Sequence, residues 1–267
     1  MESAPRVRSL NGAAGFVDRV GIALVFPKDD LVLPSLWEAI AGAREVEWAV
    51  RDTAGTFLSF TPEMDRLWRW KDDLPAERLA CAGRHLARVV SLVSPALVSS
   101  LYVRTERDGR ADDFRAAGLS SLQLEIAEAV LENGPCCGPE IRMLLSTSDK
   151  RGVDAGLQSL QRLLVLTHAG IVEQEHGWPA IRLDLFARQW RTQLRRLPSA
   201  DDARRRLAAT VLQSAGDVSA ADLGAALGWR RREAAVTLAE LEETGAAASH
   251  DEAGIKVWSP RGAFRDA

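Results

Sequence analysis

The same succession of sequence patterns occurs twice in the C-terminal half of this chain, over residues 119–183 and 200–260. Each copy starts with apolar residues at helical spacing, such as Leu122, Ile126 and Val130 in the first. A short helix, a longer helix and two short runs of β-forming residues follow in the same order. Three helices and a hairpin within about seventy residues are typical of a winged helix-turn-helix. The repeat therefore predicts two such domains in tandem.

Capping residues mark where several helices of the repeat begin and end. In the second copy, Ser219 is a good N-cap for the short helix, and Gly228 supplies the left-handed residue that ends it. In the first copy, Asp149 is expected to cap the third helix. The hairpin of that copy is expected to turn at His176 and Gly177.

Helical and β-forming patterns alternate in the N-terminal part of the chain. We expect helices over Ser9–Leu24, Ser35–Ala41 and Leu74–Ala87, followed by a β-rich run over Val89–Val93. The end of the first helix has an alternative, because Ile22–Phe26 also has the composition of a short strand.

A polar and charged run over Thr105–Asp113 is the first clear shift in composition, and it indicates a linker. We expect three domains: an N-terminal α+β domain over residues 1–114, a winged-helix domain with a linking helix over 115–198, and a second winged-helix domain over 199–267. The expected fold class is mainly α with short β-hairpins (α+β), with tandem winged helices behind an N-terminal α/β domain.

Composition excludes several classes of protein. No run approaches the roughly 18 apolar residues of a membrane span, and no apolar segment typical of a signal peptide follows the N-terminus. The three cysteines, of which Cys136 and Cys137 are adjacent, fit a reducing compartment better than a disulfide framework. The four histidines are scattered without the spacing of zinc ligands. We therefore expect a cytoplasmic protein with no metal and no cofactor.

Arginines are concentrated near the repeat, although the formal net charge is −3 and the pI is about 5.9. Cations at a helix N-terminus oppose the helix dipole, so helix stability does not explain the basic starts of the third helices. Contact with phosphates or guanine edges does explain them. The basic run from Arg182 to Arg206 adds to this surface. The candidate residues for binding double-stranded DNA are Lys150, Arg151, Arg195, Arg196, Arg204, Arg205, Arg230, Arg231 and Arg232.

Acidic residues support an alternative in which the repeat is a protein-docking scaffold. Asp251 and Glu252 lie in the expected hairpin turn of the second copy, where they repel phosphate. Winged helices also bind proteins, and fold alone does not assign function. A protein partner or self-association therefore remains the alternative to DNA.

An aromatic and basic cluster over residues 68–71 has two interpretations. Trp68, Arg69, Trp70 and Lys71 could form a surface on which unpaired bases stack while cations meet phosphates. Tryptophans are more often buried anchors of a core, because each buries a large apolar area. We favour the core interpretation.

Four short motifs resemble the bacterial winged-helix proteins related to AlkZ-type alkylpurine DNA glycosylases. They are Gly21-Ile-Ala-Leu-Val-Phe-Pro27, Leu33-Pro-Ser-Leu-Trp-Glu-Ala39, Trp70-Lys-Asp-Asp-Leu-Pro75 and Val93-Ser94. The resemblance covers about residues 10–190 and does not account for the second copy of the repeat. It implies tandem winged helices and DNA binding.

The resemblance also raises the question of catalysis. In the true glycosylases, a Gln, an apolar residue and a Gln or Asp position the water that attacks the sugar. The nearest match in this chain is Gln123-Leu124-Glu125, which lies inside an expected helix. Motifs for a nucleophilic serine elbow, a P-loop or a dinucleotide fold are absent from the sequence. We therefore predict noncatalytic DNA binding, with unknown catalytic residues and a glycosylase-like repair protein as a further alternative.

Overall fold

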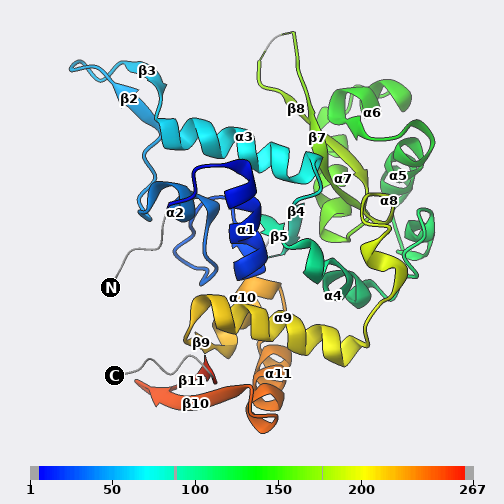
Figure 1. The fold of residues 1–267 in the computed structure, drawn as a ribbon. Coiled ribbons are helices and arrows are strands. Elements are labelled where there is room, and N and C mark those ends of the chain that lie inside the picture. Colours follow the sequence, from blue (N-terminus) through cyan, green and yellow to red (C-terminus); the bar gives the residue numbers. More distant parts are fainter. Residues whose placement is uncertain (1–5, 87–88, 176, 262–267) are drawn as a thin grey trace. The chain divides into compact units, whose positions relative to one another are not determined.

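The computed structural model describes residues 6–86, 89–175 and 177–261, and it shows a mixture of helices with small β-sheets (Figure 1). The chain divides into two compact units. One comprises Met1–Lys71 and Arg204–Ala267, and the other comprises Asp72–Ala203. Among the described residues, no helix has both the length and the apolar character needed to cross a membrane.

The first unit begins with α1 (Leu10–Val20), β1 (Ile22–Leu24) and α2 (Leu36–Ala41). Ser9 caps α1, and Gly21 ends that helix with a φ of 73°. The expected helix over Ser9–Leu24 therefore stops earlier, and the alternative of a strand after it is the one observed. The Ser35–Glu38 capping box starts α2 where the sequence predicted a helix.

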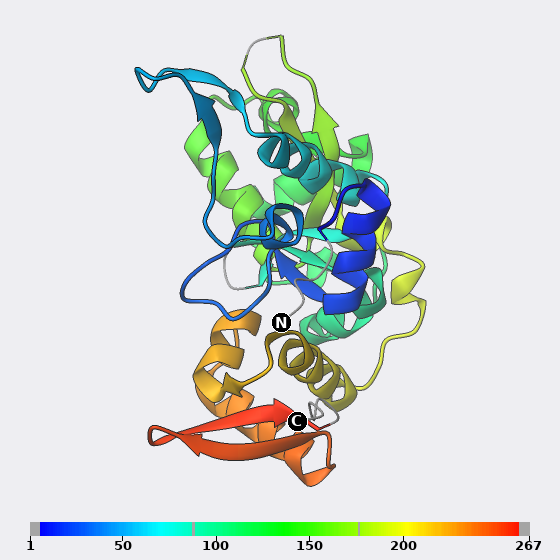
Figure 2. The ribbon, with the colours of Figure 1, turned by 60° about the vertical axis from the view of Figure 1, so that its left-hand side comes forward.

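A two-stranded antiparallel hairpin follows, formed by β2 (Ala49–Arg51) and β3 (Phe57–Phe60). It leads into α3 (Pro62–Ala76), and two views show the hairpin projecting beyond the start of that helix (Figures 1 and 2). The helix contains Pro75, which cannot donate a backbone hydrogen bond, and it ends one residue later at Ala76.

The second unit contains a β-hairpin where the sequence predicted a helix over Leu74–Ala87. It consists of β4 (Cys81–Leu86) and β5 (Val89–Val93), and only the β5 prediction is confirmed. The predicted helix is wrong beyond Ala76, because Arg78 adopts a left-handed φ of 58°. Cys81 then pairs with Val93 in the sheet while both side chains are buried. Sheet pairing thus overrides the local helical pattern.

Short helical turns connect this hairpin to the first copy of the repeat. They are η1 (Pro95–Leu97), α4 (Val98–Tyr102), η2 (Val103–Thr105) and η3 (Asp113–Ala116). The segment expected to be a linker lies between the last two turns, and it carries a buried ion pair between Arg107 and Asp113. Buried charges of this kind belong to a packed structure.

The first copy has three helices and a three-stranded sheet. Its elements are α5 (Ser121–Asn133), β6 (Cys136–Cys137), α6 (Gly138–Leu144), α7 (Lys150–Arg162), β7 (Leu166–Val172) and β8 (Ala180–Leu185). The strands are ordered β6-β8-β7, and Asp149 caps α7 as predicted. Ile126, Val153 and Leu160 are fully buried in the core between the helices and the sheet. The expected hairpin residue His176 lies outside the described residues.

The second copy repeats this succession of elements and pairings. Its elements are α9 (Ala200–Ala215), β9 (Val218–Ser219), α10 (Ala220–Leu227), α11 (Arg231–Glu243), β10 (Ala247–Glu252) and β11 (Ile255–Pro260). The strand order is β10-β11-β9, so in both copies the last strand lies between the other two. Ser219 caps α10, and Gly228 ends it at a φ of 68°, as the sequence predicted. The expected linking helix before this copy is instead two short turns, α8 (Phe186–Gln189) and η4 (Gln193–Arg195).

A buried histidine lies where β4, α7 and β7 pack together. Nδ1 of His85 is 2.8 Å from the backbone oxygen of Gln161, and Nε2 is 3.3 Å from Oγ1 of Thr167. Burial lowers the pKa of His85 from 6.5 to about 4, because the charged imidazolium loses its hydration there, and nearby Arg104 acts in the same direction. The native state therefore holds this ring neutral.

Acidification is expected to destabilise the protein through His85. Above pH 6.5 the ring is neutral in both the folded and unfolded states, whereas below it the unfolded chain binds a proton that the folded chain does not. The free energy of unfolding should fall by about 2 kcal/mol between pH 7 and pH 5 from this group. Urea titrations at both pH values measure it. The loss should shrink in His85→Gln and persist in the exposed control His250→Gln, and an equal loss in all three proteins would contradict the assignment.

Candidate nucleic-acid interface

Three consecutive arginines stand at the start of α11. Arg230 is the N-cap residue, and its side chain makes no capping hydrogen bond. Arg230, Arg231 and Arg232 are all exposed. Within the described part of the chain, none of the three has a carboxylate within ion-pair distance. The positive end of the helix dipole disfavours cations at this place, so their clustering costs stability.

A pocket of about 380 Å³ brings two of these arginines together with a third from another helix. Arg230 and Arg232 line it from the start of α11, and Arg204 lines it from α9. The remaining lining residues are Glu233, Val236 and Thr237. Thr237 is buried and donates its hydroxyl hydrogen to the backbone oxygen of Glu233, so arginine side chains supply the hydrogen-bond donors that this pocket can offer an anion.

The charge of this pocket suits a phosphate more than a neutral ligand. Three guanidinium groups face one carboxylate, that of Glu233, among the lining residues. Guanidinium groups bind phosphate oxygens through paired, charge-assisted hydrogen bonds. Val236, which is 52% exposed, adds an apolar side chain to the lining. The pocket is therefore a candidate for contact with a phosphate backbone.

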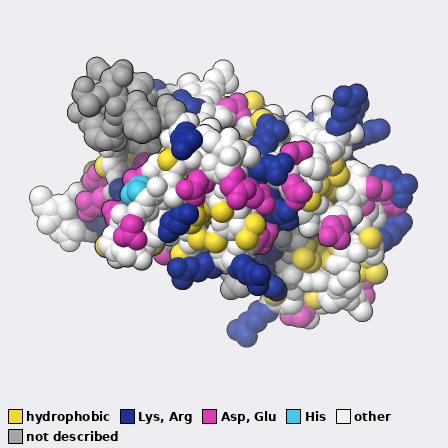
Figure 3. All heavy atoms as spheres, turned by 90° about the horizontal axis from the view of Figure 1, so that it is seen from below, with side chains coloured by type: hydrophobic (Ala, Val, Ile, Leu, Met, Phe, Trp, Pro, Cys, Tyr) yellow, Lys and Arg dark blue, Asp and Glu magenta, His cyan; other side chains and the backbone are white. Residues whose placement is uncertain are grey.

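The β10–β11 hairpin, which follows α11, carries acidic residues at its turn. Asp251 and Glu252 are exposed at the end of β10. Glu242, near the end of α11, accepts hydrogen bonds from Ser249 and Lys256, which lower its pKa to about 2. These bonds attach the hairpin to α11. Viewed from below, the surface shows Lys and Arg side chains interspersed with acidic and hydrophobic ones (Figure 3).

The other predicted cations lie in different surroundings. Lys150 and Arg151 are exposed in the first turn of α7, and Arg195 and Arg196 are exposed at η4. All four belong to the second unit. Arg205 lies in the first unit, where its Nη1 is 3.9 Å from the Glu240 carboxylate.

Two arginines of the basic run have carboxylate partners within the second unit. Arg188 pairs with Asp184 and donates hydrogen bonds to the backbone oxygens of Val130 and Leu131. Nη2 of Arg182 is 3.8 Å from the carboxylate of Glu140. The run between Arg182 and Arg206 is thus divided between structural and exposed side chains.

The Gln123-Leu124-Glu125 segment serves to start a helix. The side-chain oxygen of Gln123 accepts the backbone N–H of Ser120 in a capping box, and its Nε2 donates to Oγ of Ser159 at 2.8 Å. Both ends of the amide are therefore engaged within the fold. Leu124 and Glu125 are exposed on α5.

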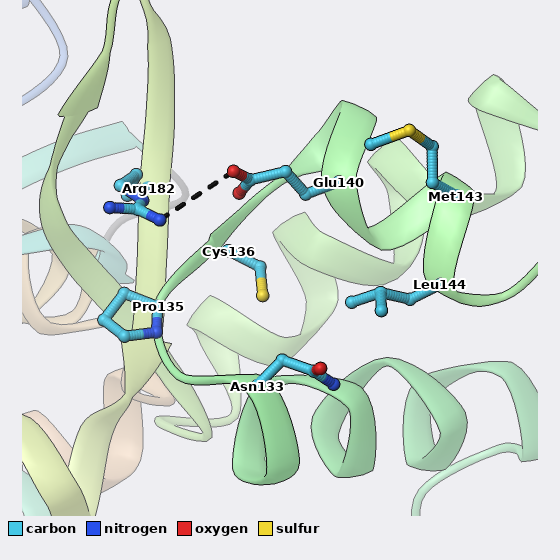
Figure 4. A pocket seen from close by; sticks show the side chains of 7 residues that line it. All are labelled: Asn133, Pro135, Cys136, Glu140, Met143, Leu144 and Arg182. Carbon is cyan, nitrogen blue, oxygen red and sulfur yellow. Dashed lines mark ion pairs between the residues drawn. The ribbon is translucent and has the colours of Figure 1, made fainter.

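A second pocket of about 360 Å³ lies beside Cys136 in the second unit (Figure 4). Its lining residues are Asn133, Pro135, Cys136, Glu140, Met143, Leu144 and Arg182. Burial raises the pKa of the Cys136 thiol, so its thiolate is disfavoured. A hydrogen bond from the backbone N–H of Cys137 lowers the pKa of Glu140, which makes it a weak proton acceptor. This pocket therefore lacks an activated nucleophile or a tuned general base. No group of three or more potential metal ligands occurs among the residues that the structure describes.

Comparison with known proteins places the chain in a family. The family model described as AlkZ related matches residues 7–228. The chain belongs to the AlkZ-related family. The match extends beyond the region covered by the motifs in the sequence and includes α9 and α10. No curated protein matches.

Solved structures support the fold. The Streptomyces sahachiroi DNA glycosylase AlkZ is similar at 15% sequence identity and a TM-score of 0.53, over 97% of this chain and 66% of that protein. This chain thus spans less than two thirds of its length. The DIP2311 protein from Corynebacterium diphtheriae has 15% identity and a TM-score of 0.22, over 79% of this chain and 43% of its own, and that score carries no argument.

Sequence reasoning identified the arginines and missed the pocket that unites them. Arg204 and Arg230 lie on different elements, and packing brings them to one site. Val236 is an apolar residue of α11, yet it is half-exposed and lines the pocket. The sequence contained one indication of this arrangement, because Val236 comes four residues after Arg232 and so lies on the same face of the helix.

Proposed function

We propose that this chain binds duplex DNA without catalysing a reaction on it, through the pocket that Arg204, Arg230 and Arg232 line. The convergence of three arginines at one site carries the proposal. Membership of the AlkZ-related family and the fold shared with a protein named as a DNA glycosylase support it.

Both copies of the repeat are proposed to be winged helix-turn-helix domains. The succession of helices and the central position of the last strand support this assignment. In such domains the third helix contacts the major groove, and α11 and α7 occupy that place. Arg230, Arg231, Lys150 and Arg151 then lie at helix starts that reach phosphates or base edges. The division into domains over residues 1–114, 115–198 and 199–267 stays part of this proposal.

Salt dependence tests the phosphate contact directly. If three phosphates are neutralised, affinity for a 20-base-pair duplex should fall roughly 40-fold between 50 and 200 mM salt, because counterions are released on binding. Fluorescence anisotropy with a labelled duplex measures the slope. A wild-type protein that binds no duplex at low salt would refute the proposal, and salt-insensitive association with a protein would favour the scaffold alternative.

Glycosylase activity is the second candidate, and the family relationship is the observation in its favour. Because both ends of the Gln123 amide are engaged in the fold, we expect no free base when alkylated duplex DNA is incubated with the protein. Chromatography of the supernatant measures release. Base release that is lost in Gln123→Ala, with unchanged folding, would show that this residue acts in catalysis after all.

A further inference from the structure

An exposed aromatic surface on β2, β3 and the residue before β2 is not used by the proposed duplex contact. Trp48 is 49% exposed, Phe57 is 50% exposed and Leu58 is 59% exposed. Val50 on the same hairpin is 43% exposed. Large apolar side chains that stay exposed on a hairpin, the two aromatic rings above all, indicate an interaction surface. The hairpin projects beyond the start of α3 in two different views (Figures 1 and 2).

Ring contacts connect this surface into a continuous aromatic cluster. Trp48 stacks on Phe26 with centroids 5.1 Å apart and meets Trp68 edge-on at 6.4 Å. Phe60 stacks against Trp68 and contacts Phe57 at 5.6 Å. The cluster holds the two half-exposed rings, Trp48 and Phe57, in fixed orientations. Fixed, solvent-accessible rings are the arrangement on which unstacked bases bind.

The charges around the cluster fit an anionic chain of low charge density. Nζ of Lys71 lies 4.5 Å from the Trp68 ring, and Arg51 is exposed on β2 with its guanidinium bonded to the Gly55 oxygen. Of the nearby carboxylates, that of Asp65 is paired with Arg69 at 2.6 Å. Glu47 is exposed, which limits the net attraction for phosphate. Stacking, and not phosphate contact, is the main source of affinity that this surface offers.

The arrangement of the exposed side chains suits single bases more than a second copy of the chain. Phe57 pairs with Arg51, and Val50 is next to Arg51 on β2, so strand alternation places Val50 and Phe57 on opposite faces of the hairpin. A stacked base covers one ring face and does not need a continuous apolar face. We propose that the aromatic surface of the β2–β3 hairpin binds unpaired bases of single-stranded DNA, independently of the duplex contact at α11.

The test uses the full chain with a labelled twenty-nucleotide oligothymidylate and, separately, a 20-base-pair duplex. Trp48→Ala with Phe57→Ala should weaken oligothymidylate binding at least about tenfold, because a base stacked on an aromatic ring accounts for roughly 5- to 150-fold in affinity. Duplex affinity should stay within about twofold. Trp178→Ala removes a tryptophan that is 64% exposed in the other unit, and it should leave both affinities unchanged.

Two further variants keep the test decisive. Phe57→Ala alone removes a half-exposed ring and leaves the Phe26–Trp48 stack intact, so it reports on binding if the double variant fails to fold. Trp48→Phe keeps an aromatic face and should retain most of the affinity. The proposal would be overturned if Phe57→Ala and the double variant bound oligothymidylate as tightly as the wild type. It would also be overturned if the wild-type protein did not bind oligothymidylate. If the double variant abolished self-association of the protein and left its affinity for oligothymidylate unchanged, the surface would be assigned to contact with a second copy.

Discussion

Replacing Arg230 and Arg232 by alanine is expected to lower duplex affinity at least about tenfold at low salt and to reduce the salt slope by about two. Both side chains line one pocket, so their loss removes two of its three cations. Anisotropy titrations at several salt concentrations measure both quantities. The fold should persist, because both residues are exposed and neither caps α11 through its side chain.

A control with the same change in net charge separates this pocket from general attraction. Arg8 and Lys28 are exposed cations of the same unit that do not line the pocket. Alanine at both positions should change duplex affinity less than about twofold. Equal losses in the two double variants would mean that the net charge, and not the pocket, drives binding. An unchanged affinity in the Arg230 and Arg232 variant would remove α11 from the interface.

Local signals account for the parts of the fold that the sequence predicted well. α10 begins after Ser219 and ends at Gly228, because a capping residue and a left-handed glycine each act within one helical turn. The hairpins of both copies were expected for the same reason, since β-forming runs and turn residues are adjacent in the chain.

Contacts between distant residues account for the failures. The strand at Cys81–Leu86 exists through pairing with β5 and packing beside α7 and β7, which no window of the local sequence reports. The candidate site shows the same limit. The basic residues in the first turn of the third helix were visible in the sequence. That Arg204 and Arg230 line one pocket depends on how α9 packs on α11. The burial of Trp70 agrees with the core interpretation of that tryptophan, whereas the exposed rings, Trp48 and Phe57, lie outside the cluster that the sequence singled out.

The polar run Thr105–Asp113 illustrates how composition misleads. Arg107 and Asp113 look like linker residues, yet their side chains are 4% and 6% exposed and 3.2 Å apart. Arg107 also donates hydrogen bonds to the backbone oxygens of Leu163 and Leu164 at the end of α7. Asp113 accepts further hydrogen bonds from the Tyr102 hydroxyl and the Gly109 backbone. Each charge thus has an ion-pair partner and further hydrogen bonds, which is the condition under which buried ions are tolerated.

Breaking this pair is expected to be the most destabilising single change considered for this protein. Arg107→Ala should lower the free energy of unfolding by about 3–5 kcal/mol, because it leaves the Asp113 carboxylate buried without its cation and removes the hydrogen-bond donor of two backbone oxygens just after α7. Chemical denaturation followed by circular dichroism measures the loss. Arg110→Ala is the matched control, since Arg110 is 77% exposed and pairs with Asp108 at the surface, and its loss should stay within about 0.5 kcal/mol.

The partner substitution shows whether the effect belongs to the pair. Asp113→Asn keeps the size of the side chain and removes its charge, so it leaves Arg107 buried without a carboxylate and should also be strongly destabilising. The double variant should cost less than the sum of the two single losses, because each single change already breaks the same interaction. Additive losses, or a loss below about 1 kcal/mol in Arg107→Ala, would show that the segment behaves as the flexible linker its composition suggests.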